Sequence, residues 1–320
     1  EFEMRKTAAA YTRTKQDKTG IINPLKLHSY KFNDDIFKRI SVTPDGKNHG
    51  MMMFIDWSGS MSDKLRSTIH QTINLALFCK KVQIPFEVYA FSNSSAKRKT
   101  TNLNYQLNDI TIDNRFHLIN FASSRMNTRE FDIAMRNLYQ VSCLYNPERW
   151  NWRRTTSAER SWMYDLPDAP RGYGLSSTPL NDCIMAAYKL VPAFVKRYSI
   201  DKMNTIFLTD GCSDGNNGKI VDMESGHSHA EIINNKFKRD YMMSYDKHSI
   251  MVDRKTKRQY HCEDGWRNPN GLTENLLQIL KDRTDSKVLG FYISARKKID
   301  TYAMDKYFNY DMRSKIHAQF

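Results

Sequence analysis

The sequence is poor in the features on which secreted and membrane-spanning proteins depend. It has five cysteines, an odd number spread along the chain, which indicates reduced thiols rather than a disulfide framework. No apolar run is long enough to cross a bilayer, and the first residues do not form a signal peptide. The sequence starts at Glu1 rather than Met, so we expect it to be part of a longer chain. We therefore expect a cytoplasmic protein without a membrane partner.

Patterns of self-sufficient catalysis are also missing. We find no nucleophile paired with a base, no two carboxylates at a glycosidase spacing and no glycine-rich phosphate loop. His227 and His229 have no cysteine or carboxylate cluster at ligand spacing, which favours exposed loop histidines over a transition-metal site. His261 and Cys262 likewise lack the partner spacing of a zinc site. The sequence therefore predicts no intrinsic catalysis.

Acidic residues are outnumbered: 35 Asp and Glu face 49 Lys and Arg, which gives a formal net charge of +14. Such a charge favours an anionic partner, either nucleic acid or an acidic face of another protein. A surface of solvated Lys and Arg without any partner explains the charge equally well. With 320 residues, the chain can bury a full core as one elaborated domain.

The most informative stretch is an apolar run that is followed directly by residues with polar side-chain oxygens. The run Met51 to Ile55 stops at Asp56, and Ser58 and Ser60 follow on either side of a glycine. This pattern predicts a buried parallel strand that delivers a carboxylate and two hydroxyls to the edge where open α/β sheets bind ligands. These are hard oxygen donors, suited to a Mg²⁺ ion that keeps water molecules and leaves one position open. Ordinary turn residues alone would explain the serines as well.

A helix and two later stretches complete the pattern. Apolar residues every four positions predict a helix over residues 63–83, with Ser62 or Asp63 as its N-cap. Thr178 stands directly before a second helix whose first position is Pro179. Residues 205–209 form a second apolar strand, which ends at Asp210. Of two nearby acids, Asp182 is expected to complement a helix dipole. Asp214 is expected to cap a loop, with a place in the second shell of the metal as the alternative.

In order and context, these three stretches resemble the metal-ion-dependent adhesion site (MIDAS) of von Willebrand factor A (VWA) domains. The resemblance implies that Ser58, Ser60 and Thr178 are direct Mg²⁺ ligands and that Asp56 and Asp210 act mostly through bound water. Mn²⁺ or Ca²⁺ would be substitutes. The resemblance also implies an α/β fold with a doubly wound, mostly parallel, Rossmann-like sheet, interrupted by helical and β-hairpin insertions.

The rest of the chain resembles one subgroup of VWA proteins more loosely. A Gly-Ile-Ile-Asn-Pro step at 20–24 and a charged strand at 36–40 are similar to those of the cobaltochelatase subunit CobT and its relatives, which also occur in large tailed bacteriophages. The composition, rich in Lys, Asn and Tyr, is compatible with a phage version, so we expect the protein in a bacterial cell or a phage-infected host. We expect an N-terminal arm over 1–49 that packs on the domain. The VWA domain would cover 50–320, with insertions at about 93–174 and 215–270.

The other elements follow from local patterns. We expect strands at 86–92, parallel to the first, at 110–112 and at 288–294, and helices at 128–138, capped by Thr128, at 273–283 and, closing the fold, at 302–308. A long hairpin is expected over 241–262, with a basic tip at 253–258.

Two basic regions are candidate partner surfaces. Tryptophans interleaved with arginines between 149 and 171 suit a subunit interface or single-stranded nucleic acid, and an ordinary loop remains an alternative. The hairpin tip could contact phosphates or an acidic protein, or simply be solvated. The residues predicted to bind partners are Trp57, Trp150, Trp152, Arg153, Arg154, Arg254, Lys255, Lys257 and Arg258.

The resemblance implies a function in protein interaction. CobT-type and similar intracellular VWA proteins work beside AAA+ ATPases of the MoxR or CobS-like chelatase kind, where an acidic side chain of a partner or target completes the Mg²⁺ shell. We therefore expect a Mg²⁺-dependent adaptor, which would act in chelation only as the non-ATPase subunit of a cobaltochelatase-like complex. Two alternatives stay open: a nucleic-acid-binding VWA protein similar to Ro-type ribonucleoproteins, and a structural component of a virion or scaffold.

Overall fold

The computed structural model describes residues 15–22, 37–42, 48–93, 105–144, 173–214, 218–224, 231–233, 237–241, 249–262 and 271–293. The chain divides into two compact units, Glu1–Asn48 and His49–Phe320. In the first unit, β1 (Lys15–Ile22) pairs antiparallel with β2 (Phe37–Val42), which corresponds to the charged strand predicted at 36–40. The boundary between the units falls one residue before the predicted end of the N-terminal arm.

The second unit is built on a five-stranded sheet in the order β13-β7-β3-β4-β6. Its strands are β3 (His49–Asp56), β4 (Phe86–Asn93), β6 (Phe116–Ser123), β7 (Lys202–Thr209) and β13 (Lys287–Tyr292). The first four in sheet order are parallel, and β6 runs antiparallel to β4 at the edge. The prediction of a mostly parallel α/β sheet is confirmed. Because the chain leaves β3 toward β4 and later returns to its other side as β7, the strand order reverses at β3, where such sheets form a ligand crevice.

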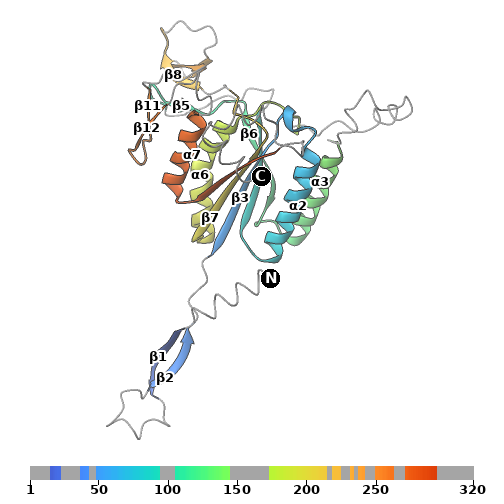
Figure 1. The fold of residues 1–320 in the computed structure, drawn as a ribbon, viewed down its shortest axis with the longest axis vertical. Helices are drawn as coiled ribbons and strands as arrows, with labels where there is room; N and C mark the ends of the chain where they lie inside the picture. Colours follow the sequence, from blue (N-terminus) through green and yellow to red (C-terminus); the bar gives the residue numbers. More distant parts are fainter. Residues whose placement is uncertain are drawn as a thin grey trace, which may run out of the picture. The chain divides into compact units, whose positions relative to one another are not determined.

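Two hydrophobic cores, one on each face of the sheet, explain why β3 is apolar throughout. Met53 and Ile55 belong to the core under α2 (Leu65–Lys81) and α3 (Thr128–Leu144). Met52 and Phe54 belong to the core under α6 (Leu180–Tyr198) and α7 (Gly271–Thr284). Successive residues of a strand point to opposite faces, so a strand covered on both faces needs no polar position. Figure 1 shows the two helix pairs on either side of the sheet.

Residues 105–144, within the predicted insertion at 93–174, contribute a strand and a helix that pack with the central sheet. Strand β6 extends the central sheet, and Phe121 and Ala122 are buried in the same core as α3. The helix is capped by Asn127 instead of Thr128: the Asn127 side chain accepts the N–H of Glu130 at 2.9 Å, and the Glu130 carboxylate accepts the N–H of Asn127 at 3.0 Å. This reciprocal pair is a capping box, and Thr128 becomes the first helical residue.

A second, antiparallel sheet joins residues from both predicted insertions. Its order is β5-β8-β10-β9, from β5 (Ile110–Thr111), β8 (Gly218–Asp222), β10 (Phe237–Tyr241) and β9 (Glu231–Ile233). Within the predicted hairpin, β11 (Ile250–Val252) pairs antiparallel with β12 (Gln259–His261), and Tyr241 belongs to β10.

Of the helices in the described ranges, none is both long and apolar enough to span a bilayer. The predicted closing helix at 302–308 lies outside these ranges. Helix α7 begins at Gly271, two residues before its predicted start, and α6 begins at Leu180, so that Pro179 occupies the N-cap position rather than the first helical position.

Candidate metal centre

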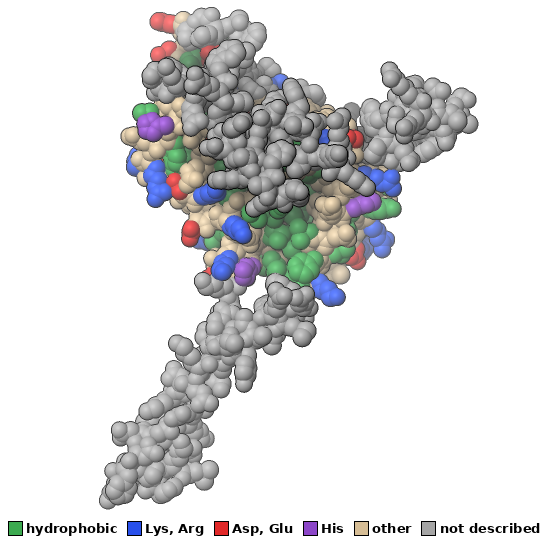
Figure 2. All heavy atoms as spheres, viewed as in Figure 1, with side chains coloured by type: hydrophobic (Ala, Val, Ile, Leu, Met, Phe, Trp, Pro, Cys, Tyr) green, Lys and Arg blue, Asp and Glu red, His purple; other side chains and the backbone are tan. Residues whose placement is uncertain are grey.

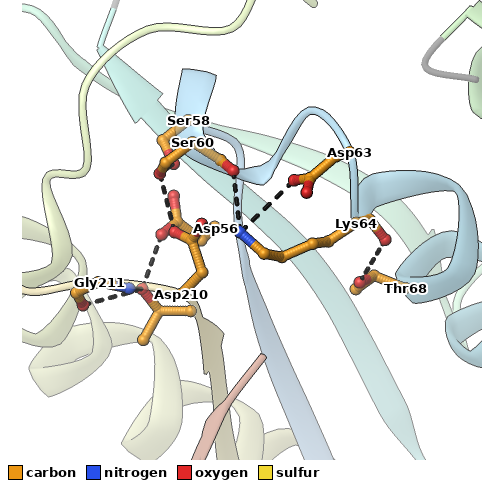
Figure 3. Close-up of polar contacts among 9 residues, drawn as sticks. Asp56, Ser58, Ser60, Asp63, Lys64, Thr68, Asp210 and Gly211 are labelled. Atoms are coloured by element: carbon orange, nitrogen blue, oxygen red, sulfur yellow. Dashed lines mark hydrogen bonds and ion pairs between the residues drawn. The ribbon is translucent and has the colours of Figure 1, made fainter. Parts of the chain in front are cut away.

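The candidate centre lies at the carboxyl ends of two neighbouring strands. Asp56 is the last residue of β3, and the short 3₁₀ turn η2 (Gly59–Met61) then leads toward α2. Asp210 directly follows β7, which pairs with β3 along its length. Figure 3 shows both acids on one side of the turn that carries the two serines. The sheet therefore brings together residues more than 150 positions apart at the crevice where the strand order reverses.

Hydroxyl groups connect the two acids to their surroundings. The Ser60 hydroxyl donates to Asp210 Oδ1 at 2.8 Å, and the Ser58 and Ser60 hydroxyls share a hydrogen bond of 3.1 Å. Thr209 Oγ1 donates to Asp56 Oδ2 at 2.7 Å. Four of the five predicted ligands, Asp56, Ser58, Ser60 and Asp210, thus gather at one place. The role of Thr209 was missed, although it lies directly before Asp210 at the end of a predicted strand.

The segment with the fifth predicted ligand, Thr178, is held between the two strand ends by backbone contacts. Gly59 donates its N–H to the carbonyl of Ser176 at 2.9 Å, and Ser58 and Ser176 form an isolated parallel bridge. On the other side, the Asp214 carboxylate accepts the N–H of Thr178 at 2.5 Å, and the Thr178 carbonyl accepts the N–H of Asp214 at 2.9 Å. Asp214 therefore holds the backbone of the Thr178 segment, and Thr178 itself is buried.

One carboxylate oxygen of Asp56 is buried without a hydrogen-bond partner among the described residues. Its side chain is fully buried, and Oδ1 has no hydrogen-bond partner among the described residues, whereas Oδ2 accepts from Thr209. Burial raises the pKa of Asp56 to about 6, against the hydrogen bond from Thr209. Buried polar atoms are nearly always satisfied, and an orphan is explained by an ion or water that belongs there. The orphaned oxygen of Asp56 leaves one acceptor of the centre open to a group outside the described residues.

Lys64 is a member of this cluster that the sequence reading did not predict. Its ammonium lies 2.7 Å from Asp210 Oδ2, 3.1 Å from the Ser60 carbonyl oxygen and 3.4 Å from Asp63 Oδ1 (Figure 3). Burial would lower the pKa of Lys64, but the hydrogen bond and charge of Asp210 outweigh it and raise the pKa. Lys64 also occupies the N-cap position of α2 without a side-chain cap bond, so the predicted caps Ser62 and Asp63 are wrong.

The donor set fits a hard divalent cation. Two carboxylates and hydroxyl oxygens of Ser and Thr are the ligand types that Mg²⁺ accepts. Throughout the described ranges, no three His, Cys, Asp or Glu side chains come together as a metal-binding group. A cation in the candidate centre would therefore depend on the hydroxyl oxygens as well as on Asp56 and Asp210.

A pocket of about 650 Å³ adjoins the centre between α2 and the strands β7 and β13. Lys64 and Asp63 lie in its wall together with apolar residues of the sheet, among them Ile206 and Leu208. Phe291 and Tyr292 of β13 also line it and are about half exposed. The pocket gives the side chain of Lys64 open space beside its present position.

The predicted partner-binding residues lie in different environments. Trp57 is fully buried, donates its indole N–H to the Tyr173 carbonyl at 2.8 Å and packs edge-on against Phe121, so its predicted contact with a partner is wrong. At the hairpin tip, Arg254 pairs with Asp109 and Arg258 pairs with Asp282 at 2.8 Å. Lys255 and Lys257 are exposed. The remaining predicted residues, Trp150, Trp152, Arg153 and Arg154, lie outside the described ranges, as do His227 and His229.

Figure 2 shows Lys and Arg side chains dispersed around the described part of the visible face, where apolar side chains gather near the centre. The basic residues described on this face therefore do not form one continuous patch of the kind that tracks a phosphate backbone.

Comparison with known proteins adds little. No family model matches the sequence, and no curated protein matches it. Among solved structures, the pilus adhesin SpaC from Lactobacillus rhamnosus GG, in an open conformation, is similar over 77% of this chain, with 13% identity and a TM-score of 0.38. The aligned region spans 24% of the adhesin chain, about a quarter of its length. A superposition this loose carries no conclusion about fold family or function.

Proposed function

We propose that the protein is a Mg²⁺-dependent interaction module of the VWA type, which binds an acidic group of another protein through a cation in the candidate centre. One observation carries the proposal. Asp56 is buried with an oxygen that no described group satisfies, beside the hydroxyls of Ser58 and Ser60 and the carboxylate of Asp210. A bound cation, or a water molecule in its shell, would satisfy that oxygen.

The architecture around the centre supports this proposal. All three stretches of the MIDAS pattern meet at the switch point of a mostly parallel sheet, and Gly59 and Asp214 tie the Thr178 segment to the other two. A strand-end crevice of this kind is where open α/β sheets bind ligands.

Each residue has a defined task in the proposed centre. Ser58, Ser60 and Thr178 would hold the cation directly, and Asp56 and Asp210 would hold water molecules of its shell. The ion supplies an electrophilic position for one incoming carboxylate. Because hydroxyl ligands are neutral, much of the charge of the ion remains available to attract that carboxylate. Mn²⁺ or Ca²⁺ would serve as substitutes.

The partners are proposed from the resemblance to CobT-type proteins. They are an AAA+ ATPase of the MoxR or CobS-like kind and a target that presents an acidic residue. The protein would then pass ATP-driven motion of the ATPase ring to the bound target, without catalysis of its own. The same resemblance places it in a bacterial cell or a phage-infected host.

The test is a pull-down from host extract with wild type and with the double variant Asp56→Ala/Ser58→Ala, each in Mg²⁺ and in chelator. We expect an ATPase or one other protein to be retained only by wild type in Mg²⁺, as identified by mass spectrometry. The matched control is Ser62→Ala, which removes a hydroxyl two residues beyond Ser60 and should retain the same partner.

Equal retention by both proteins would contradict the proposal. Retention of mainly nucleic acid, lost steeply as salt rises, would favour the nucleic-acid alternative, since phosphate contacts release counterions. The charge of +14 motivates this arm of the test, while the ion pairs of Arg254 and Arg258 leave fewer free cations at the hairpin tip.

A further inference from the structure

We propose that Lys64 is a tethered counter-ion of the candidate centre: its ammonium group neutralises Asp210 when no divalent cation is bound, and it must leave Asp210 before one binds. The inference rests on the proposed function, because it assigns a regulatory residue to the same centre.

The contacts place the ammonium within the polar cluster rather than on the surface. Lys64 Nζ lies 2.7 Å from Asp210 Oδ2 and 3.1 Å from the Ser60 carbonyl oxygen. The Lys64 side chain is 17% exposed and the Asp210 side chain 3% exposed, so water screens this pair only weakly. Asp210 Oδ1 is occupied by the Ser60 hydroxyl. Both oxygens of Asp210 therefore have side-chain partners, Ser60 and Lys64.

Electrostatics explain why a cation is needed there. Two carboxylates, Asp56 and Asp210, are buried at adjacent strand ends, and burying an ionised group without a partner is costly. The ammonium offsets part of that cost by pairing with Asp210. An ammonium and a divalent cation repel each other at a few ångströms and would compete for the same oxygens of Asp210 and its hydration sphere. Divalent binding is then an exchange of cations, in which breaking the Lys64–Asp210 pair subtracts from the affinity.

The structure also offers the displaced ammonium a destination. Asp63 Oδ1 already lies 3.4 Å from Lys64 Nζ, and the Asp63 side chain is 50% exposed. Both residues line the pocket of about 650 Å³ between α2 and β13, which gives the side chain space to turn away from Asp210. An exposed pair with Asp63 is weak, so the exchange retains a net cost that lowers the affinity for the divalent cation. The affinity of the isolated protein is thereby kept below what its oxygen ligands alone would give.

The first experiment titrates Mg²⁺ into chelator-treated, full-length protein by isothermal titration calorimetry. Lys64→Met keeps the length of the side chain and removes its charge. We expect Lys64→Met to bind Mg²⁺ about tenfold more tightly than wild type, which corresponds to about 1.4 kcal/mol. Lys81→Met, an exposed lysine at the other end of α2, is the matched control and should bind like wild type.

Equal or weaker binding by Lys64→Met, with wild type binding Mg²⁺, would overturn the counter-ion role and leave the metal centre standing. Absence of Mg²⁺ binding in wild type and Lys64→Met alike would overturn the proposed function and this inference together. The two failures are therefore distinguishable.

A second measurement needs no variant and so does not depend on the folding of one. Amine-reactive labelling of wild type, read by mass spectrometry, reports how accessible the Lys64 ammonium is. We expect labelling of Lys64, relative to Lys81, to rise several-fold when Mg²⁺ replaces chelator, because the ammonium has left Asp210. An unchanged ratio in protein that calorimetry shows to be loaded would overturn the inference.

Discussion

The buried side chain of Arg239 determines which residue fits beside it on the adjacent strand. Its side chain is buried, lies 3.5 Å from the Asp113 carboxylate and fills the space above Gly218 on the adjacent strand. A Cβ added at Gly218 would lie 1.9 Å from Arg239 Nε and 2.6 Å from Cγ. Glycine at 218 therefore leaves room for the buried arginine in the position that it occupies.

We predict that Gly218→Ala destabilises the protein by about 2 kcal/mol, the scale of overpacking a well-filled interior. The measurement is the free energy of unfolding by chemical denaturation. Gly290→Ala is the control, since a Cβ at Gly290 meets no heavy atom within 4 Å, and it should change stability by less than about 0.5 kcal/mol. Similar effects of the two substitutions would show that Arg239 can move aside.

Asp182 supplies a pH-dependent contribution from the same cluster. Burial raises its pKa to about 7, against the hydrogen bond from the Asp113 N–H and the charge of Arg239. Between the usual pKa of 3.8 and about 7, the folded protein keeps a proton that the unfolded chain releases. Stability from this residue is therefore present at low pH and falls as pH rises through that window. The expected role of Asp182 in complementing a helix dipole does not account for this burial.

We predict that the free energy of unfolding falls less between pH 4 and 7 in Asp182→Asn than in wild type, by on the order of 2 kcal/mol. The check is a series of urea unfolding curves at stepped pH, with wild type and variant in chelator so that metal binding does not contribute. The prediction fails if the two pH profiles run parallel.

At the scale of elements, an ion pair ties the β11–β12 hairpin to α7. Asp253 is buried at the start of the turn and pairs with Arg283 of α7, while the N–H groups of Lys255 and Thr256 donate to its carboxylate. Burial alone would raise the pKa of Asp253, but the hydrogen bonds from Arg283 and the turn outweigh it and hold the pKa well below its usual range. The Asp253–Arg283 pair therefore links the turn of the hairpin directly to α7.

We predict that Asp253→Ala costs about 3 kcal/mol at neutral pH, because it leaves Arg283 without its buried partner and the turn without its acceptor. The contribution of Asp253 should be fully present above pH 4 and should begin to decline as the pH falls below 3.8, because the pKa of the folded state lies well below that value. Urea unfolding at pH 7 and at pH 3 measures both effects. Lys255→Ala, in the same turn with an exposed side chain, should behave like wild type.

At the scale of the whole molecule, the sheet couples the centre to global stability. Strands β3 and β7, which end at Asp56 and before Asp210, lie in the middle of the sheet and are covered by helices on both faces. A ligand that binds these strand ends only in the folded state must stabilise the entire second unit.

We predict that Mg²⁺ at 100 times its dissociation constant raises the free energy of unfolding of wild type by about 2.7 kcal/mol. Asp56→Asn should gain nothing from Mg²⁺, since the amide cannot replace the carboxylate in the shell. Thermal unfolding in Mg²⁺ and in chelator, for both proteins, provides the readout. An equal gain in both would place the stabilising ion elsewhere.

Local patterns along the chain determined much of this architecture. The apolar runs before Asp56 and Asp210 and the four-residue spacing after Asp63 are consequences of strand and helix geometry, which act over a few residues and can be read in order. These patterns were enough to predict the cluster of Asp56, Ser58, Ser60 and Asp210, because parallel strands end at one edge of their sheet.

The tertiary structure decided what depends on contacts between distant segments. Strand β6 lacks a clear alternation, and its place was set by pairing with β4. The second sheet combines β5 with strands more than 100 residues later, which no local pattern encodes. Trp57 was expected at a surface and became core. Lys64 approached Asp210 across 146 positions of sequence, and that contact exists only because β3 and β7 are neighbours.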